Sequence, residues 1–133
     1  MNVVLISTYE LGRQPFGLAS PAAWLRPRGH QVTSADLSRG RLPEAAVRDA
    51  DVVAFYLPMH TATRLVEPVV ARVRELAPAA RLYAYGLYAP MNADWLRGLG
   101  VSTALGGEFE AGLVELVEGR DARAGIERLD FVV

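Results

Sequence analysis

The residue types that the chain lacks limit its chemistry before any motif is considered. It contains no cysteine, which excludes disulfides, thiolate zinc sites, iron–sulfur clusters and cysteine nucleophiles. All 14 basic residues are arginine, so Schiff-base chemistry, a Walker lysine and the phosphate-pairing lysine of response regulators are excluded as well. The two histidines and the isolated carboxylates form no triad and no acid–base pair. We therefore predict no catalytic residue in this chain.

Four segments instead have the composition of ligand-binding loops. They combine aromatic side chains, glycines and hydroxyl groups with few charges, and they span residues 7–17, 57–61, 86–91 and 106–108. Such loops offer flat apolar surface and backbone amides freed by glycine. They suit a large, planar, mostly neutral ligand better than a compact phosphate, and the chain has no G-x-G-x-x-G or Walker motif.

Each of these loops follows a short apolar run that reads as a buried strand. The five runs cover residues 3–7, 31–36, 51–56, 81–85 and 101–105. Their nearly continuous apolar content is typical of strands that are buried on both faces of a parallel sheet. The connectors are long enough for right-handed crossover helices. The pattern predicts an α/β fold, a doubly wound three-layer sandwich with a five-stranded parallel sheet in the flavodoxin-like order 2-1-3-4-5.

The connectors also carry helix signals. We expect helices near residues 20–29, 43–50, 61–77, 92–99 and 109–117. Ser20 followed by Pro21 predicts the start of the first helix, as an N-cap with proline in the first helical position. Pro68 predicts a kink or a late start of the third helix. Asn92 is expected to cap the fourth helix, with Trp95 facing the core.

Length and charge indicate one globular domain. The 133 residues carry a formal net charge of −1, which points to neither nucleic acid nor an anionic membrane as a partner. The longest apolar runs, such as residues 52–57, are far short of a membrane span, and we expect a soluble cytoplasmic protein, either a monomer or a homo-oligomer. The domain is predicted over residues 1–118. Residues 119–133 read as a linker or C-terminal extension, whose apolar end indicates truncation or a packed terminal segment.

The loops and strand starts together resemble a known family. The matching stretches are residues 5–12 (LISTYELG), 14–19 (QPFGLA), 29–32 (GHQV), 54–61 (AFYLPMHT) and 106–108 (GGE). In order and spacing they are similar to the N-terminal cobalamin-binding domain of cobalamin-dependent radical SAM proteins, over about residues 3–117. The resemblance implies cobalamin as the cofactor, with the corrin ring across the carboxyl ends of the strands and its nucleotide tail directed between the loops.

That edge is also where an open parallel sheet binds ligands, because strand order reverses there. The residues assigned to the cofactor are Thr8, Tyr9, Gly12, Phe16, Gly17, Pro58, Met59, His60, Thr61, Gly86, Leu87, Tyr88, Gly106, Gly107 and Glu108. Simpler roles remain open for several of them. The glycines equally permit tight turns. His60 and Glu108 equally suit polar contacts at the start of a helix.

The resemblance has two departures that define the expected role. Other cobalamin domains carry Asp-x-His-x-x-Gly in the first loop, with the histidine on cobalt, whereas this loop has neither residue type, and His60 is the one candidate substitute. Radical SAM chemistry also needs a three-cysteine cluster site, which this chain lacks. The resemblance therefore implies a cofactor domain that is not catalytic alone and that works with a radical SAM barrel domain, fused or separate.

Two other classes of function remain open. The first is a non-catalytic α/β interaction or regulatory domain, and the second is a flavodoxin-like binder of flavin or nucleotide. The first loop, with its aromatic residues and prolines, fits a flavin phosphate loop poorly. A response regulator would need an aspartate at the end of the third strand, and Asp51 stands at the start of that strand instead.

Overall fold

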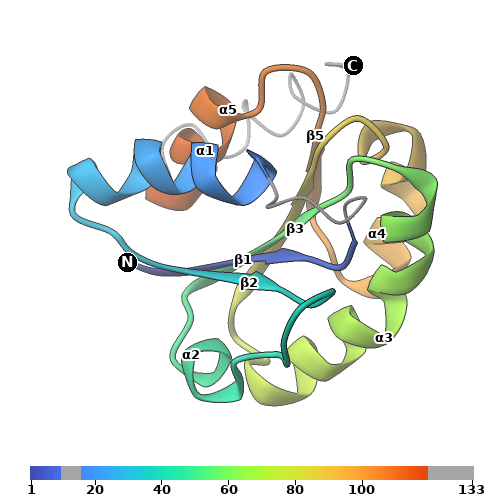
Figure 1. Ribbon diagram of the computed structural model, residues 1–133, viewed down its shortest axis with the longest axis horizontal. Coiled ribbons are helices and arrows are strands. Elements are labelled where there is room, and N and C mark those ends of the chain that lie inside the picture. Colours follow the sequence, from blue (N-terminus) through green and yellow to red (C-terminus); the bar gives the residue numbers. More distant parts are fainter. Residues whose placement is uncertain (10–15, 120–133) are drawn as a thin grey trace.

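The structure, a computed structural model, describes residues 1–9 and 16–119 and contains a five-stranded sheet. The strands are β1 (Asn2–Ser7), β2 (Gln31–Asp36), β3 (Val52–Tyr56), β4 (Arg81–Tyr85) and β5 (Thr103–Leu105). All neighbours pair in parallel, in the order β2-β1-β3-β4-β5, as the sequence predicts (Figure 1). The third and fifth strands begin one and two residues later than expected.

Helices cover both faces of the sheet. They are α1 (Phe16–Leu25), α2 (Glu44–Arg48), α3 (His60–Leu76), α4 (Ala93–Leu99) and α5 (Glu110–Glu118). Figure 1 shows α1 and α5 on one face and α2, α3 and α4 on the other. Among the described residues, no helix has the length and apolar content needed to cross a membrane. The predicted C-terminal extension lies, apart from Gly119, outside the described residues, as does Gly12.

The core consists of two apolar clusters separated by the sheet. Successive side chains of a strand point to opposite faces, so β1 gives Val4 and Ile6 to the α2–α4 side and Val3 and Leu5 to the α1–α5 side. All five residues of β3 are buried. Burial on both faces explains why the strands read as continuous apolar runs rather than alternating ones.

The prediction for the start of the first helix is wrong, and the reason lies in two side-chain contacts. Helix α1 begins at Phe16, so Pro21 lies inside it and cannot donate a hydrogen bond to the carbonyl of Gly17. The hydroxyl of Tyr85 donates to that carbonyl instead, at 2.6 Å. Ser20 does not cap the helix, because its hydroxyl donates to Glu110 in α5, also at 2.6 Å.

Three further expectations about the helices can be compared with the structure. Helix α3 begins at His60 and continues through Pro68, so the late start is wrong. Pro68 cannot donate to the carbonyl of Arg64, and both residues are exposed, so water can supply the missing donor. Asn92 makes no capping bond, because its side chain donates to the carbonyl of Tyr88 at 2.7 Å. Trp95 is 39% exposed rather than in the core, whereas Leu96 is buried.

The contact between Tyr85 and Gly17 gives a double-mutant test. Replacing Tyr85 by Phe leaves a buried carbonyl without a donor, and we expect a loss of about 1–3 kcal/mol in the free energy of unfolding. Pro21→Ala supplies the missing backbone N–H, so Tyr85→Phe should cost clearly less in that background. Urea unfolding of the four proteins measures the coupling.

Tyr83→Phe is the matched control, since Tyr83 lies on the same strand but its hydroxyl is 3.4 Å from the carbonyl of Leu116. Its cost should be the same in the parent chain and in the Pro21→Ala background. An equal cost of Tyr85→Phe in both backgrounds would show that the carbonyl of Gly17 does not depend on the tyrosine.

Candidate functional site

The strand register aligns one row of side chains at the carboxyl edge of the sheet. Ser7 pairs with Asp36 on one side and with Tyr56 on the other, and Tyr56 pairs with Tyr85, which pairs with Leu105. Residues paired in register point to the same face, and Tyr56, Tyr85 and Leu105 belong to the core cluster under α1 and α5. The edge therefore presents this row to α1 and α5.

Aromatic rings fill the middle of that row. The ring centroids of Tyr85 and Phe109 are 4.8 Å apart, and those of Tyr56 and Tyr85 are 5.3 Å apart. All three rings are buried or nearly so. Gly17 lies against the same cluster, since a Cβ at this position would be 2.2 Å from the Cζ atom of Tyr56. We call these rings (Tyr56, Tyr85 and Phe109) the aromatic cluster, and it closes the side of the edge that faces α1 and α5.

The loops after β3 and β4 are locked to each other. The amide of Leu57 donates to the carbonyl of Tyr85, and the carbonyl of Leu57 accepts from the amide of Tyr88. Gly86 has a φ of +116°, and a Cβ there would be 2.7 Å from the carbonyl oxygen of Leu57. The glycine is thus required by backbone geometry and by the close approach of Leu57.

Two hydroxyl groups mark the end of β1. Thr8 donates to the carbonyl of Ala62 at 2.8 Å and so ties the first loop to the first turn of α3. The hydroxyl of Ser7 is fully buried and has no hydrogen-bond partner among the described residues. An unpartnered buried hydroxyl is uncommon in folded proteins, and the hydroxyl of Thr103 is a second one among the described residues.

The sequence-predicted residues that the structure describes all lie at or beside this edge, at different depths. Those exposed to solvent are Phe16, His60, Thr61, Leu87, Gly107 and Glu108. Those half-buried are Tyr9, Pro58, Met59 and Tyr88. Those buried are Thr8, Gly17, Gly86 and Gly106, and Gly12 lies outside the described residues. The structure brings His60 beside Tyr88, with ring centroids 6.5 Å apart. It places Gly17 in direct contact with the ring of Tyr56 in the aromatic cluster.

Large apolar side chains are exposed at this edge beside the polar ones. Phe16 is 66% exposed at the start of α1, and Leu87 is 62% exposed after β4. Met91, in the turn before α4, is 68% exposed. Within residues 1–9 and 16–119, no three His, Cys, Asp or Glu side chains gather closely enough to hold a metal ion. The edge can therefore offer apolar contact to a flat ligand and a few polar groups around it.

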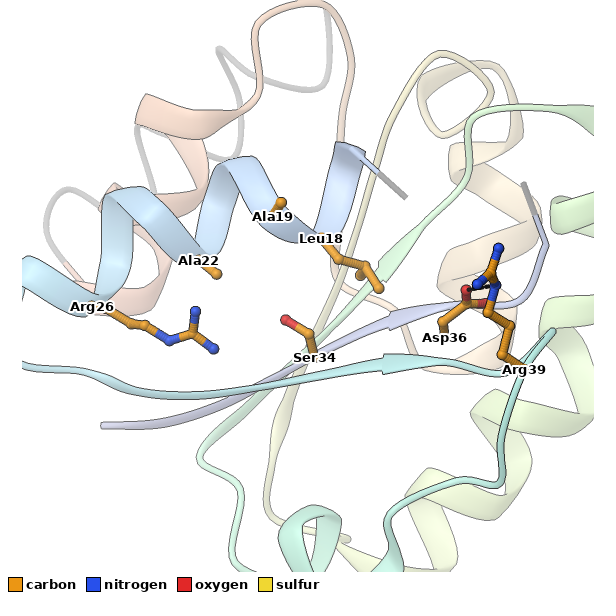
Figure 2. A pocket seen from close by; sticks show the side chains of 7 residues that line it. All are labelled: Leu18, Ala19, Ala22, Arg26, Ser34, Asp36 and Arg39. Carbon is orange, nitrogen blue, oxygen red and sulfur yellow. Dashed lines mark ion pairs between the residues drawn. The ribbon is translucent and has the colours of Figure 1, made fainter. Parts of the chain in front are cut away.

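Sequence reasoning missed two features of the region. The tyrosines of β3 and β4 read as ordinary strand aromatics, and nothing in the pattern shows that they meet Phe109. A hollow between α1 and β2 was also missed, although it contains Asp36 and Arg39 (Figure 2). The available signal was the position of Asp36, an acidic residue at the end of a predicted strand beside the first loop.

Comparison with known proteins gives a fold and no family. Neither a protein-family model nor a curated protein sequence matches the chain. Among solved structures, it is similar to the radical S-adenosylmethionine methyltransferase TsrM from Kitasatospora setae, determined with its tryptophan substrate and a SAM analogue, at 18% identity and a TM-score of 0.68. The match covers 95% of this chain but 27% of TsrM, so the chain spans about a quarter of that protein.

Two other structures share the fold. One is a response regulator from Burkholderia pseudomallei with a phosphorylated aspartate, at 17% identity and a TM-score of 0.61, covering 95% of this chain and 74% of that one. The other is a flavodoxin-like domain from Synechococcus, at 16% identity and a TM-score of 0.55. That match covers 96% of this chain and 85% of the Synechococcus chain. Three proteins of different kinds match nearly the whole chain, so the comparison establishes a flavodoxin-like fold.

Burial of Tyr85 predicts that the free energy of unfolding falls at alkaline pH. Burial, and then the nearby Tyr56 and Glu110, raise the pKa of Tyr85 well above its usual value near 10. The folded chain holds the phenol proton of Tyr85 more tightly than the unfolded chain does. The stability that Tyr85 contributes is therefore complete below about pH 10 and declines as the pH rises toward its folded pKa. We expect the free energy of unfolding to fall by up to about 1.4 kcal/mol per pH unit from this group.

Urea unfolding between pH 8 and pH 11 checks this dependence. Tyr85→Phe should have a shallower decline than the parent chain. Burial raises the pKa of Tyr83 too, so part of the slope should remain in that variant. Identical slopes in the two proteins would contradict the assignment to Tyr85.

Proposed function

We propose that this chain is a cobalamin-binding module whose corrin ring lies across the carboxyl edge of the sheet. The observation that carries the proposal is the set of exposed apolar side chains from separate elements at this edge, namely Phe16, Leu87 and Met91. Three large apolar side chains left exposed around one edge of the sheet favour ligand contact there. A broad and nearly neutral macrocycle matches such a surface better than a phosphate does.

The residues at this edge fit the cofactor in kind. The apolar side chains offer contact to a ring face, while His60, Thr61 and the backbone around Gly107 offer polar groups to the amide side chains of the corrin. Because the aromatic cluster fills the side toward α1 and α5, the ring would rest on the outer surface of the loops.

The second part of the proposal concerns the partner. The sequence resembles the cobalamin domain of radical SAM proteins, and the similarity in fold to TsrM, a radical SAM methyltransferase, agrees with that resemblance. When bound, cobalamin supplies methyl transfer or redox chemistry. Since the chain has no cysteine for an iron–sulfur cluster, we propose that it holds the cofactor for a radical SAM barrel domain, fused or separate, and catalyses nothing alone.

Titration with hydroxocobalamin and methylcobalamin tests the binding site. We expect binding by calorimetry and by visible spectra, and Leu87→Gln should weaken it roughly tenfold or more, because a buried leucine contact is replaced by a polar group. Trp24→Gln is the matched control, since Trp24 is 50% exposed and precedes the last residue of α1, the helix whose first residue is Phe16. It should leave the affinity unchanged.

The same titration separates the alternatives. Binding of flavin mononucleotide without binding of cobalamin would replace the proposal with a flavodoxin-like function. No binding of either cofactor at about 100 μM, a concentration that detects even weak ligands, would favour the interaction or regulatory domain. Equal effects of the Leu87 and Trp24 substitutions would place the ligand somewhere other than this edge.

A second measurement tests how cobalt is held. His60 begins α3 and its ring lies beside that of Tyr88, a position that suits contact with the ring periphery. We expect His60→Ala to leave the visible spectrum of bound cobalamin unchanged. A shift of the cobalt absorption bands in this variant, and not in Thr61→Ala, would instead make His60 the cobalt ligand.

A further inference from the structure

A hollow of about 480 Å³ separates α1 from the edge strand β2 (Figure 2). Its lining residues are Leu18, Ala19, Ala22, Arg26, Ser34, Asp36 and Arg39. None of them is among the residues assigned above to cobalamin. The volume lies within the range of small-molecule sites, roughly 300–1,000 Å³. The chemistry of its two walls defines the ligand that it can recognise.

The walls differ in chemistry. Helix α1 contributes an apolar wall of Leu18, Ala19 and Ala22, and β2 contributes the hydroxyl of Ser34 and the carboxylate of Asp36. The strand register explains the polar wall, because β2 is an edge strand and its residues 34 and 36 face α1. A ligand that fits has one flat apolar part and one part rich in hydroxyl groups.

The carboxylate of Asp36 is held in place by Ser38 on one oxygen and faces Arg39 with the other. Its Oδ1 atom accepts from the amide of Ser38 at 3.0 Å and from the hydroxyl of Ser38 at 2.6 Å. Its Oδ2 atom lies 3.6 Å from the Nε atom of Arg39, an ion pair too long to be a hydrogen bond. In dinucleotide-binding α/β folds with a glycine-rich loop, a motif that this chain lacks, an acidic side chain about 20 residues after that loop accepts a hydrogen bond from ribose.

Positive charge is present at both ends of the hollow. Figure 2 shows Arg39 beside Asp36 at one end and Arg26 at the other. Arg26 is held by a hydrogen bond of 3.1 Å to the carbonyl of Val32. Leu18, in the first turn of α1, lies at the Asp36 end, and that turn carries no acidic residue. The ion pair with Arg39 offsets the charge of Asp36, and the positive end of the helix dipole favours an anion on the α1 side of this end.

We propose that this hollow binds a ribonucleoside 5′-monophosphate, at a site separate from the one proposed for cobalamin. The ribose hydroxyls donate to Asp36, and the phosphate lies near Arg39 and the first turn of α1. The base extends along Ala19 and Ala22 toward Arg26. A single phosphate fits better than a dinucleotide, because the chain has no glycine-rich pyrophosphate loop.

Titration of the full chain with adenosine 5′-monophosphate, followed by amide NMR signals, tests the proposal. We expect shifts that include Ala22 and Ser34. The 2′-deoxy analogue should bind roughly tenfold more weakly, since it loses one hydrogen bond to a charged acceptor. Asp36→Asn keeps the Oδ1 acceptor for Ser38, so it should fold and also bind roughly tenfold more weakly.

Asp94→Asn is the matched control, because Asp94 forms the same kind of i,i+3 pair with Arg97 at 3.1 Å but lies on α4. It should bind the nucleotide like the parent chain. If Asp36→Asn does not fold, Ala19→Leu decides, since it adds volume to the apolar wall at an exposed helical position. Equal binding of the ribo and deoxy forms, no binding, or full affinity in Ala19→Leu would overturn the proposal.

Discussion

The hydrogen bond from the Tyr85 hydroxyl to the Gly17 carbonyl joins the sheet to α1, and the candidate sites depend on it. Helix α1 contains a proline that removes one of its own hydrogen bonds, and the strand supplies the replacement. The bond can form because Gly17 has no side chain and lets the helix backbone approach Tyr56. A buried carbonyl without a donor would be costly, so this contact selects the position of the helix along the sheet. Phe16 at the edge and Leu18 in the hollow follow from that position.

The carboxyl edge consequently has two different halves. On the side of α1 and α5, the aromatic cluster is packed as part of the core and turns the Tyr85 hydroxyl inward. On the side of α3 and α4, the loops after β3 and β4 are fixed by Leu57 and Gly86, and their exposed residues include Leu87 and His60. A rigid, partly apolar surface binds with less loss of conformational entropy than a loop that must first be ordered. This division explains why a ligand at the edge would lie on the loops.

The sequence predicts the sheet well and the helix ends less well, for physical reasons. Strands buried on both faces of a sheet have nearly continuous apolar sequences, and their order follows from short right-handed connections. The start of α1 could not be predicted, because the partner that compensates for Pro21 is Tyr85, far away along the chain. Residues of the loops could be proposed for a site because aromatic and glycine residues cluster there. Asp36 was not, because its importance depends on the wall that α1 builds opposite it.

Helix α1 would couple the two proposed ligand positions. Phe16 at the carboxyl edge and Ala19 in the wall of the hollow are on one short helix, and Tyr85 anchors that helix to the sheet. A rigid element of this kind cannot move for one ligand without moving for the other. Thermodynamic linkage then requires that, if binding of the first ligand changes the affinity for the second by some factor, binding of the second changes the affinity for the first by the same factor.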